Sequence, residues 1–233
     1  MIYSSTGLEG FFIINRCGSA NCSRSIAKFM TRIVGVILAG GKGTRMGALT
    51  DSIPKPMLSI CGMPLLEHHI QLCKRHGILD IIISVSHLSD QIQSWAMDGS
   101  TWGVNITYFN ETKPLGTAGA FPAMKLDPYD HALIIYGDVY MNINFERLIQ
   151  FHTDHQAMAT LCAHPNDHPY DSDLIETNEH HQITAFHSKP HLDGINYRNL
   201  VNAGCYVIQT SLLSDIVPDK PSDFGKDIFP FLD

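Results

Sequence analysis

The stretch IVGVILAGGKGTRM at residues 33–46 decides the fold that we expect. It begins with an apolar run, which is typical of a buried strand. The run opens into a glycine-rich loop, where backbone N–H groups can approach phosphate oxygens because no Cβ is in the way. Two cations belong to this region: Arg45 can hold a phosphate with two hydrogen bonds, and Lys55, between two prolines, is a mobile point charge. The spacing is not that of a dinucleotide fingerprint, because Met46 stands where its third glycine would be.

Apolar strands alternate with helices along the chain from Ile33. We expect strands at 33–38, 80–85, 104–109, 132–136 and 157–163, and helices at 64–76, 88–97, 117–124 and 145–155. This alternation predicts an α/β fold with a mostly parallel sheet covered on both faces. Shorter alternating strands then follow at 174–176, 183–187 and 201–208, with a short helix at 211–216. They predict a small, partly antiparallel region on the same domain.

The composition limits the classes of function. With 233 residues, 44% of them hydrophobic, the chain can form one large domain. The net charge of −7 argues against a broad nucleic-acid surface, and no apolar run reaches the about 18 residues of a membrane span. The six cysteines include no Cys-x-x-Cys pair, which favours free thiols in a reducing, cytoplasmic compartment. The thirteen histidines, with His152 and His155 on one expected helix, suit a solvated surface better than a metal site.

Residues 1–29 differ from the rest of the chain because they are rich in Ser, Gly and Asn. Their one apolar run, at 11–14, is too short for a secretion signal. Met30 stands just before the first strand. We therefore expect residues 1–29 to be an extension outside the core, or to precede a true start at Met30, with the functional domain at 30–233. A tail that reaches a partner is the alternative.

The glycine-rich loop followed by Pro-Lys-Pro resembles the signature of the sugar-1-phosphate nucleotidyltransferases, Gly-Gly-x-Gly-Thr-Arg and a later Pro-Lys-Pro. The resemblance extends from about Ile33 to Asp227. It implies a Rossmann-like three-layer fold with a small antiparallel sugar-binding region. It also implies transfer of a nucleotidyl group from a nucleoside triphosphate to a sugar 1-phosphate, with Mg²⁺ as cofactor and pyrophosphate as the second product. Within the family, the chain looks most like the enzymes for heptose 1-phosphate and mannose 1-phosphate.

The resemblance assigns the nucleotide to two segments. The cradle for its phosphates comprises Leu38, Ala39, Gly40, Gly41, Gly43, Thr44 and Arg45. Arg45 would hold the departing pyrophosphate, and Lys55 would stabilise the phosphates during transfer. The base pocket matches the segment ETKPLGTAG at 111–119, with Glu111, Leu115, Gly116 and Thr117 as contacts.

Glu111 is the residue that we expect to select the base. A carboxylate only accepts hydrogen bonds, and guanine offers N1–H and N2–H₂ as neighbouring donors. Uracil offers a single ring donor and adenine offers no such pair, so this residue favours GTP. The alternative is a carboxylate at the rim of the site, paired with Lys113.

Asp138 is the expected metal ligand. It follows the strand 132–136 and Gly137, and ligands of open α/β sheets bind at the carboxyl ends of strands. A carboxylate suits Mg²⁺, a hard ion that takes few protein ligands and bridges phosphates. The resemblance assigns a second metal ligand to Asp227, with Asp223 as competitor. The alternative for Asp227 is a carboxylate that accepts backbone N–H groups at a helix start. Arg45, Lys55 and Asp138 are the expected catalytic residues.

The sugar side is also assigned by resemblance. The implied substrate-binding residues are Gly137, Ser188, Lys189, Arg198 and Asn202. Ser188 replaces a family glutamate that binds sugar hydroxyls, whereas Lys189 is kept for the sugar phosphate. Arg198 would contact a phosphate or form a surface salt bridge. The serine and the polar loop at 165–170 favour D-glycero-D-manno-heptose 1-phosphate over mannose 1-phosphate.

Other functions stay open from the sequence. They include mannose-1-phosphate guanylyl transfer, and uridylyl or adenylyl transfer to another sugar 1-phosphate. A non-catalytic regulatory subunit that binds nucleotide sugars would not need to retain Arg45, Lys55 and Asp138 together. A glycosyltransferase would carry Asp-x-Asp, which Asp138-Val139-Tyr140 lacks. A homo-oligomer and a functional link to a sugar-phosphate phosphatase are also open.

Overall fold

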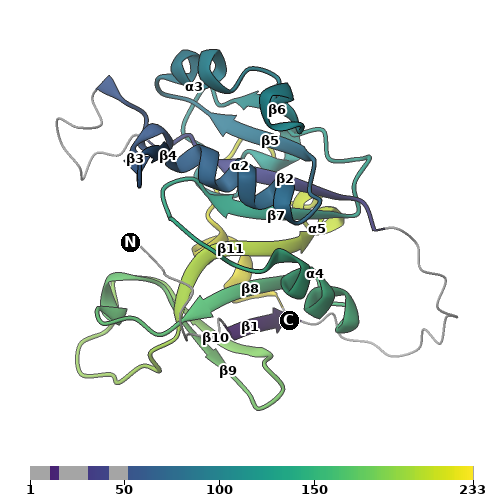
Figure 1. The fold of residues 1–233 in the computed structure, drawn as a ribbon. Helices are drawn as coiled ribbons and strands as arrows, with labels where there is room; N and C mark the ends of the chain where they lie inside the picture. The colour runs from purple at the N-terminus through teal and green to yellow at the C-terminus, as the bar shows by residue number, and fades with distance from the viewer. Residues whose placement is uncertain (1–10, 16–30, 42–51, 233) are drawn as a thin grey trace, which may run out of the picture.

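The computed structural model describes residues 11–15, 31–41 and 52–232 (Figure 1). Within these ranges the main sheet has nine strands. They are β1 (Phe11–Asn15), β2 (Ile33–Leu38), β5 (Asp80–Val85), β6 (Asn105–Asn110), β7 (His131–Tyr136), β8 (Ala159–His164), β9 (Leu174–Thr177), β10 (Ile183–His187) and β11 (Val201–Gln209). A separate hairpin pairs β3 (Ser59–Ile60) with β4 (Met63–Pro64). The helices are α2 (Leu65–Arg75), α3 (Ser89–Ala96), α4 (Phe145–Asp154) and α5 (Thr210–Ser214). None of the helices described is both long and apolar enough to cross a bilayer.

The predicted α/β sheet is confirmed. The strand order is β1-β8-β11-β7-β2-β5-β6, with β9 paired to β11 and β10 to β9. Strand β2 is parallel to both β5 and β7, and β5 is parallel to β6. Strand β11 runs antiparallel between β7 and β8, and the β9–β10 hairpin extends from it. The parallel half and the antiparallel region therefore belong to one continuous sheet.

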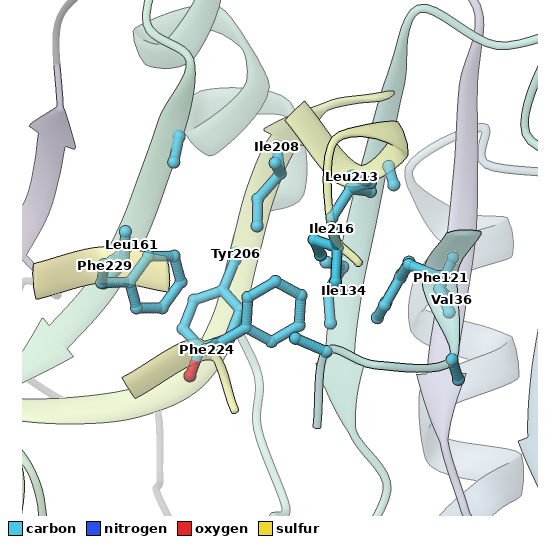
Figure 2. Packing of buried hydrophobic residues seen from close by; sticks show 14 of the residues in the cluster. Val36, Phe121, Ile134, Leu161, Tyr206, Ile208, Leu213, Ile216, Phe224 and Phe229 are labelled. Carbon is cyan, nitrogen blue, oxygen red and sulfur yellow. The ribbon is translucent and has the colours of Figure 1, made fainter. Parts of the chain in front are cut away.

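The core lies on both faces of this sheet because successive strand residues point to opposite sides. In β2, Val34 and Val36 belong to one buried cluster and Ile37 to the other. Helices α2, α3 and α4 cover the Ile37 face, while α5 and the chain's last turns cover the Val36 face. On that second face Tyr206 packs against Phe229, with ring centroids 4.9 Å apart (Figure 2). Burial on both sides explains why the strands read as continuous apolar runs.

The helix expected at 117–124 does not form. The structure has turns there, followed by a single 3₁₀ turn at Phe121–Ala123. Pro122 has no N–H to donate to the carbonyl oxygen of Ala118, as a helix would require, and the N–H of Ala118 donates to the carbonyl oxygen of Ser222 at 2.9 Å. The proline and the anchoring of this loop to a distant segment therefore override the local preference.

Part of the expected N-terminal extension lies in the sheet. Phe11–Asn15 form β1 and pair antiparallel with β8, from Phe11 opposite Ala163 to Asn15 opposite Ala159. This pairing satisfies backbone groups that β8 would otherwise present at an open edge. Met30 lies outside the described residues, so the expected start there stays a prediction.

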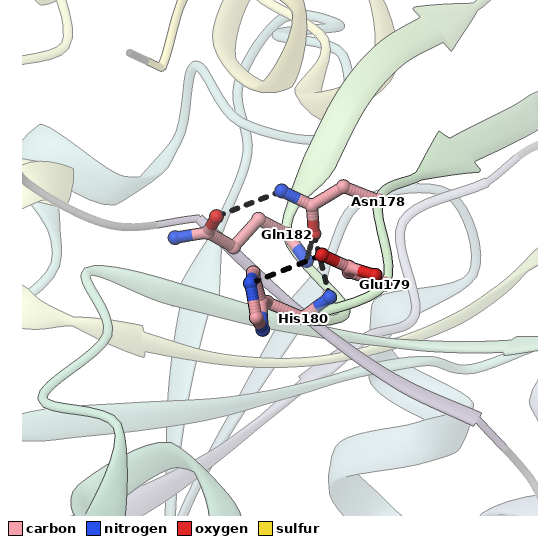
Figure 3. A network of polar contacts seen from close by, with 4 residues as sticks. All are labelled: Asn178, Glu179, His180 and Gln182. Atoms are coloured by element: carbon pink, nitrogen blue, oxygen red, sulfur yellow. Dashed lines mark hydrogen bonds and ion pairs between the residues drawn. The ribbon is translucent and has the colours of Figure 1, made fainter.

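The turn between β9 and β10 is closed by one side chain. The Oδ1 of Asn178 accepts from the N–H groups of His180 and Gln182, both at 3.0 Å, and its Nδ2 donates to the Gln182 side chain (Figure 3). Asparagine suits this role because its short side chain can bond backbone groups a few residues on. The hairpin is thus fixed by local interactions.

His152 is buried, so the expected solvated position is wrong for this histidine. Its Nδ1 lies 2.8 Å from Thr160 Oγ1, and its ring packs edge-on against His131. Burial lowers the pKa of His152 to about 3, which keeps the ring neutral. In the part of the chain that is described, no group of three or more His, Cys, Asp or Glu residues is arranged to hold a metal ion.

Candidate active site

A cavity of about 400 Å³ opens at the carboxyl ends of β2, β5, β6 and β7. Strand β2 connects through α2 to β5 on one side, while β7 lies on its other side, so the cavity occupies the switch point where ligands of open α/β sheets bind. It brings together many of the residues singled out from the sequence: Leu38, Ala39, Gly40, Gly41, Lys55, Glu111, Leu115, Gly116, Thr117 and Asp138. Gly43, Thr44 and Arg45 lie outside the described residues.

The chain that leaves β2 is held by the neighbouring strand. The N–H of Ala39 donates to the carbonyl oxygen of Ser84 at 2.8 Å, and Ser86 Oγ donates to the carbonyl oxygen of Gly40 at 2.8 Å. A Cβ on Gly40 would lie 2.9 Å from Glu111 Oε1. A side chain at position 40 would therefore displace the Glu111 carboxylate, against which the backbone passes directly.

The carboxylate of Glu111 is oriented by the buried hydroxyl of Ser84. The N–H of Glu111 donates to the carbonyl oxygen of Val85, and its Oε1 accepts from Ser84 Oγ at 2.6 Å. Ser84 is fully buried whereas Glu111 lines the cavity, so this bond holds one carboxylate oxygen against the protein interior. Lys113, the alternative partner of Glu111, instead pairs with Asp219 at 3.3 Å. Sequence reasoning missed Ser84, whose only signal is a polar residue within an apolar strand.

The loop at 115–119 is anchored to a segment more than a hundred positions later. The N–H of Ser222 donates to the carbonyl oxygen of Leu115, and the N–H of Phe224 donates to Thr117 Oγ1, each at 2.9 Å. Gly116 has a φ of +74°, and a Cβ there would collide with the carbonyl of Ser222. The loop therefore depends on both its glycine and its distant partner.

Lys55 and Asp138 form an ion pair at the cavity. Lys55 Nζ lies 3.2 Å from Asp138 Oδ2, and their side chains are 20% and 48% exposed. Lys55 begins a 3₁₀ turn between Pro54 and Pro56, which restricts its backbone. Before Asp138, the N–H of Gly137 donates to the carbonyl oxygen of Leu38 at 3.0 Å. The carboxylate is thus tied to the end of β2 and faces a cation.

His69 supports the backbone just beyond Asp138. Its Nε2 lies 2.8 Å from the carbonyl oxygen of Val139, so this nitrogen is the donor. Burial lowers the pKa of His69 to about 4, and the ring is neutral at physiological pH. From the sequence His69 is only one of the buried positions of α2, because Val139 is distant along the chain.

Asp227 makes a backbone contact. Its Oδ2 accepts from the N–H of Asp223 at 2.7 Å, and Asp223 Oδ1 accepts from the N–H of Gly225 at 3.2 Å. This arrangement matches the alternative in which the carboxylate satisfies N–H groups at a helix start. Of the two expected metal ligands, Asp138 lines the cavity and Asp227 is not among its described lining residues.

The residues expected on the sugar side each contact another part of the protein. Asn202 Nδ2 donates to the Tyr206 hydroxyl at 2.8 Å, and Ser188 Oγ donates to the carbonyl oxygen of Gly225 at 2.6 Å. Lys189 Nζ donates to the carbonyl oxygen of Asp171 at 3.0 Å. The guanidinium of Arg198, on the surface, donates to Thr177 Oγ1 at 3.1 Å.

The chain belongs to the nucleotidyl transferase family, because the family model described as Nucleotidyl transferase matches residues 34–232. A UTP–glucose-1-phosphate uridylyltransferase of Synechocystis sp. is 30% identical over 211 residues, covering 84% of this chain and 54% of that protein. A mannose-1-phosphate guanylyltransferase of Mycobacterium tuberculosis is 34% identical over 202 residues, with the same two shares. The resemblance to sugar-1-phosphate nucleotidyltransferases is confirmed, and the chain spans about half the length of these curated relatives.

A solved structure supports the fold. The crystal structure of HddC from Yersinia pseudotuberculosis complexed with GMP-PN matches with a TM-score of 0.71, at 24% sequence identity and 87% coverage of each chain. At this level of identity the match shows the shared architecture, which is the expected nucleotide-diphospho-sugar transferase type.

Proposed function

We propose that this chain transfers a nucleotidyl group from GTP to D-glycero-D-manno-heptose 1-phosphate, releasing pyrophosphate and forming a GDP-sugar. The observation that carries the proposal is the cavity at the end of β2, where the Lys55–Asp138 pair faces the glycine-rich backbone and Glu111. Membership in the nucleotidyl transferase family supports the reaction class. The cysteine usage of the chain fits action in a reducing, cytoplasmic compartment.

The reaction is an attack of a sugar-phosphate oxygen on the α-phosphorus, with pyrophosphate as leaving group. The protein has to align two polyanions and neutralise the charge that develops between them. Lys55 supplies a positive charge, and the backbone N–H groups near Gly41 supply donors. Among the described residues, none comes within 4 Å of a Cβ built on Gly41, so this backbone is open on that side. Arg45 would complete the set by holding the pyrophosphate.

Asp138 fits a Mg²⁺ ligand. Its carboxylate is half-exposed at the cavity, and hard oxygen donors are what this ion prefers. Bound there, the ion would neutralise phosphate charge. Asp227 is the proposed second ligand, and it would have to exchange its hydrogen bond with the N–H of Asp223.

The choice of GTP depends on Glu111. Ser84 occupies one lone pair of Oε1, and each carboxylate oxygen has two, so the group can still accept both guanine donors. The two curated relatives use different nucleotides by their names, so uridylyl transfer is the rival within the class. The choice of heptose depends on Ser188, which presents no carboxylate to sugar hydroxyls and donates to the carbonyl oxygen of Gly225. Mannose 1-phosphate is the rival sugar.

The test is pyrophosphate release with Mg²⁺, for the four nucleoside triphosphates crossed with heptose, mannose, glucose and N-acetylglucosamine 1-phosphates. Strong release with GTP and the heptose alone supports the full proposal. A strong pair with another base or sugar keeps the reaction class and rejects the assigned specificity. No release from any pair, with nucleotide sugars still bound, favours the regulatory alternative.

A further inference from the structure

Ser86 holds the first peptide of the glycine-rich loop. It follows β5 directly and lines the cavity, and its Oγ donates to the carbonyl oxygen of Gly40 at 2.8 Å. Within residues 11–15, 31–41 and 52–232, this is the only hydrogen bond to that carbonyl. Just before it, the N–H of Ala39 donates to the carbonyl oxygen of Ser84 at 2.8 Å. The end of β5 therefore fixes the backbone at two points as the chain leaves β2.

The two serines at the end of β5 contact different parts of the cavity wall. Ser84 Oγ donates to the carboxylate of Glu111, whereas Ser86 Oγ donates to the backbone at Gly40. A Cβ on Gly40 would lie 2.9 Å from Glu111 Oε1 and 3.6 Å from Ser86 Oγ, so both contacts converge on this glycine. The side chain at 84 therefore acts on a group that can read a base, and the side chain at 86 acts on the loop expected to hold phosphates.

The bond from Ser86 also fixes the direction of the next N–H. The peptide that joins Gly40 to Gly41 is trans, so its C=O and N–H groups lie in one plane and point in opposite directions. The carbonyl points to Ser86 on the β5 side of β2, and the N–H of Gly41 therefore points to the β7 side (Figure 1). Strand β7 leads to Asp138, which pairs with Lys55 at 3.2 Å. This N–H is thus turned toward the charged part of the cavity.

Little else in the described structure holds this peptide in place. Gly40 and Gly41 both lack a Cβ, so rotation of the peptide plane between them meets little steric resistance. A Cβ built on Gly41 would meet no described residue within 4 Å, which leaves room for such a rotation. If the plane turned over, the carbonyl oxygen would replace the N–H on the side of Lys55 and would repel a phosphate. One hydrogen bond from Ser86 therefore decides whether the loop offers a donor or an acceptor to a polyanion.

We infer that Ser86 is a positioning residue for phosphate binding: by holding the Gly40 carbonyl, it directs the N–H of Gly41 to the phosphates of the nucleotide. The inference rests on the proposed function for the identity of that ligand. The contribution is the same for every base, because all nucleoside triphosphates carry the same phosphates. Ser84 and Ser86 thus divide the nucleotide between them, one acting through Glu111 on the base and the other through the backbone on the phosphates.

The test is the Ser86→Ala variant with inorganic tripolyphosphate, a probe that carries neither base nor ribose. Its affinity is measured by calorimetry in the presence of Mg²⁺. We expect the affinity to fall at least about tenfold, because an oriented hydrogen bond to a charged group is lost, while the melting temperature changes little. In the reaction, kcat/KM should fall by a similar factor for GTP and for UTP, so that their ratio is unchanged.

Three further variants make the result specific. Ser86→Thr keeps the hydroxyl and should retain most of the affinity for tripolyphosphate. Ser84→Ala should keep this affinity and change the GTP-to-UTP ratio instead. Ser214→Ala is the matched control, because the Ser214 hydroxyl donates to the carbonyl oxygen of Thr210 at 3.1 Å within α5. It should change neither quantity.

The outcomes separate this inference from the function on which it rests. Equal tripolyphosphate affinity in Ser86→Ala and Ser214→Ala overturns the role of Ser86, and so does a loss that Ser86→Thr fails to restore. A change in the GTP-to-UTP ratio with tripolyphosphate affinity intact would mean that Ser86 acts on the base, which also overturns it. An unchanged protein that binds tripolyphosphate but releases no pyrophosphate with any pair overturns the proposed function, and the comparison of affinities still decides the role of Ser86.

Discussion

Replacing Ser84 with alanine tests whether a buried hydroxyl sets base selectivity. The change removes the bond of 2.6 Å from Ser84 Oγ to Glu111 Oε1 and leaves the rest of β5 in place. Hydrogen bonds to charged groups contribute about 1.5–3 kcal/mol. Only the part of this free energy that orients the carboxylate toward a base affects the choice between nucleotides. We take this part as ~1.4 kcal/mol, which corresponds to about a tenfold change in the GTP-to-UTP ratio.

The assay is kcat/KM for pyrophosphate release with GTP and with UTP. We expect the GTP-to-UTP ratio of Ser84→Ala to fall about tenfold. The free energy of unfolding should fall by about 1–2 kcal/mol, because a partly buried carboxylate loses a donor. Ser214→Ala is the control, since the Ser214 hydroxyl donates only to its own helix at Thr210. It should leave the ratio unchanged.

One result would refute this reasoning. If Ser84→Ala lowers the melting temperature but keeps the GTP-to-UTP ratio, the hydroxyl only stabilises the fold, and Glu111 does not read the base through it. A ratio that rises would mean that the bond holds Glu111 away from guanine.

Three other perturbations follow from the structure. Lys55→Ala removes the cation that lies 3.2 Å from Asp138. It should lower kcat for pyrophosphate release at least about a hundredfold, with little change in melting temperature. A smaller loss of kcat would assign the charge stabilisation to other groups. Gly137→Ala should destabilise the protein by about 1–3 kcal/mol in urea unfolding, because its Cβ would lie 2.6 Å from the carbonyl oxygen of Leu38. Gly41→Ala should not, because its Cβ would meet no described residue within 4 Å. Equal unfolding curves would contradict this. His152 has a folded pKa of about 3, below its unfolded value near 6.5, so the unfolded chain binds the proton first as the pH is lowered. The free energy of unfolding should therefore decrease by up to about 1.4 kcal/mol for each pH unit of acidification between those two values. His152→Phe should show a shallower fall in urea unfolding at pH 7 and pH 5, and identical slopes would rule out this contribution.

The fold could be predicted where the signal is local. Strands β2 and β5 are mostly apolar and buried, and their predicted bounds, 33–38 and 80–85, match the structure. Positions at strand ends, such as Glu111 and Asp138, follow from the same reasoning, because the ends of parallel strands meet at one edge.

What could not be predicted depends on partners that are distant in sequence. Ser84 and His69 lie in stretches that look like ordinary core, and their roles come from contacts with Glu111 and Val139. The helix expected at 117–124 is replaced by turns, because Pro122 lacks an N–H and the loop is anchored to Ser222 and Phe224. For Asp227 the sequence left two interpretations open, a metal ligand and a carboxylate that accepts backbone N–H groups. The structure shows its Oδ2 accepting from the N–H of Asp223, and the metal role stays a proposal.

The contact between the loop at 115–119 and Ser222 has a consequence for synthesis on the ribosome. Chains are made from the N-terminus, so β2, α2 and β5 can pair long before Ser222 is added. Until then the carbonyl of Leu115 and the hydroxyl of Thr117 lack their donors at Ser222 and Phe224, and Gly116 leaves that loop free to move. The nascent chain can therefore form the pairing of β2 with β5 early, whereas the loop at 115–119 reaches its final arrangement only after residues 222–224 have been synthesised.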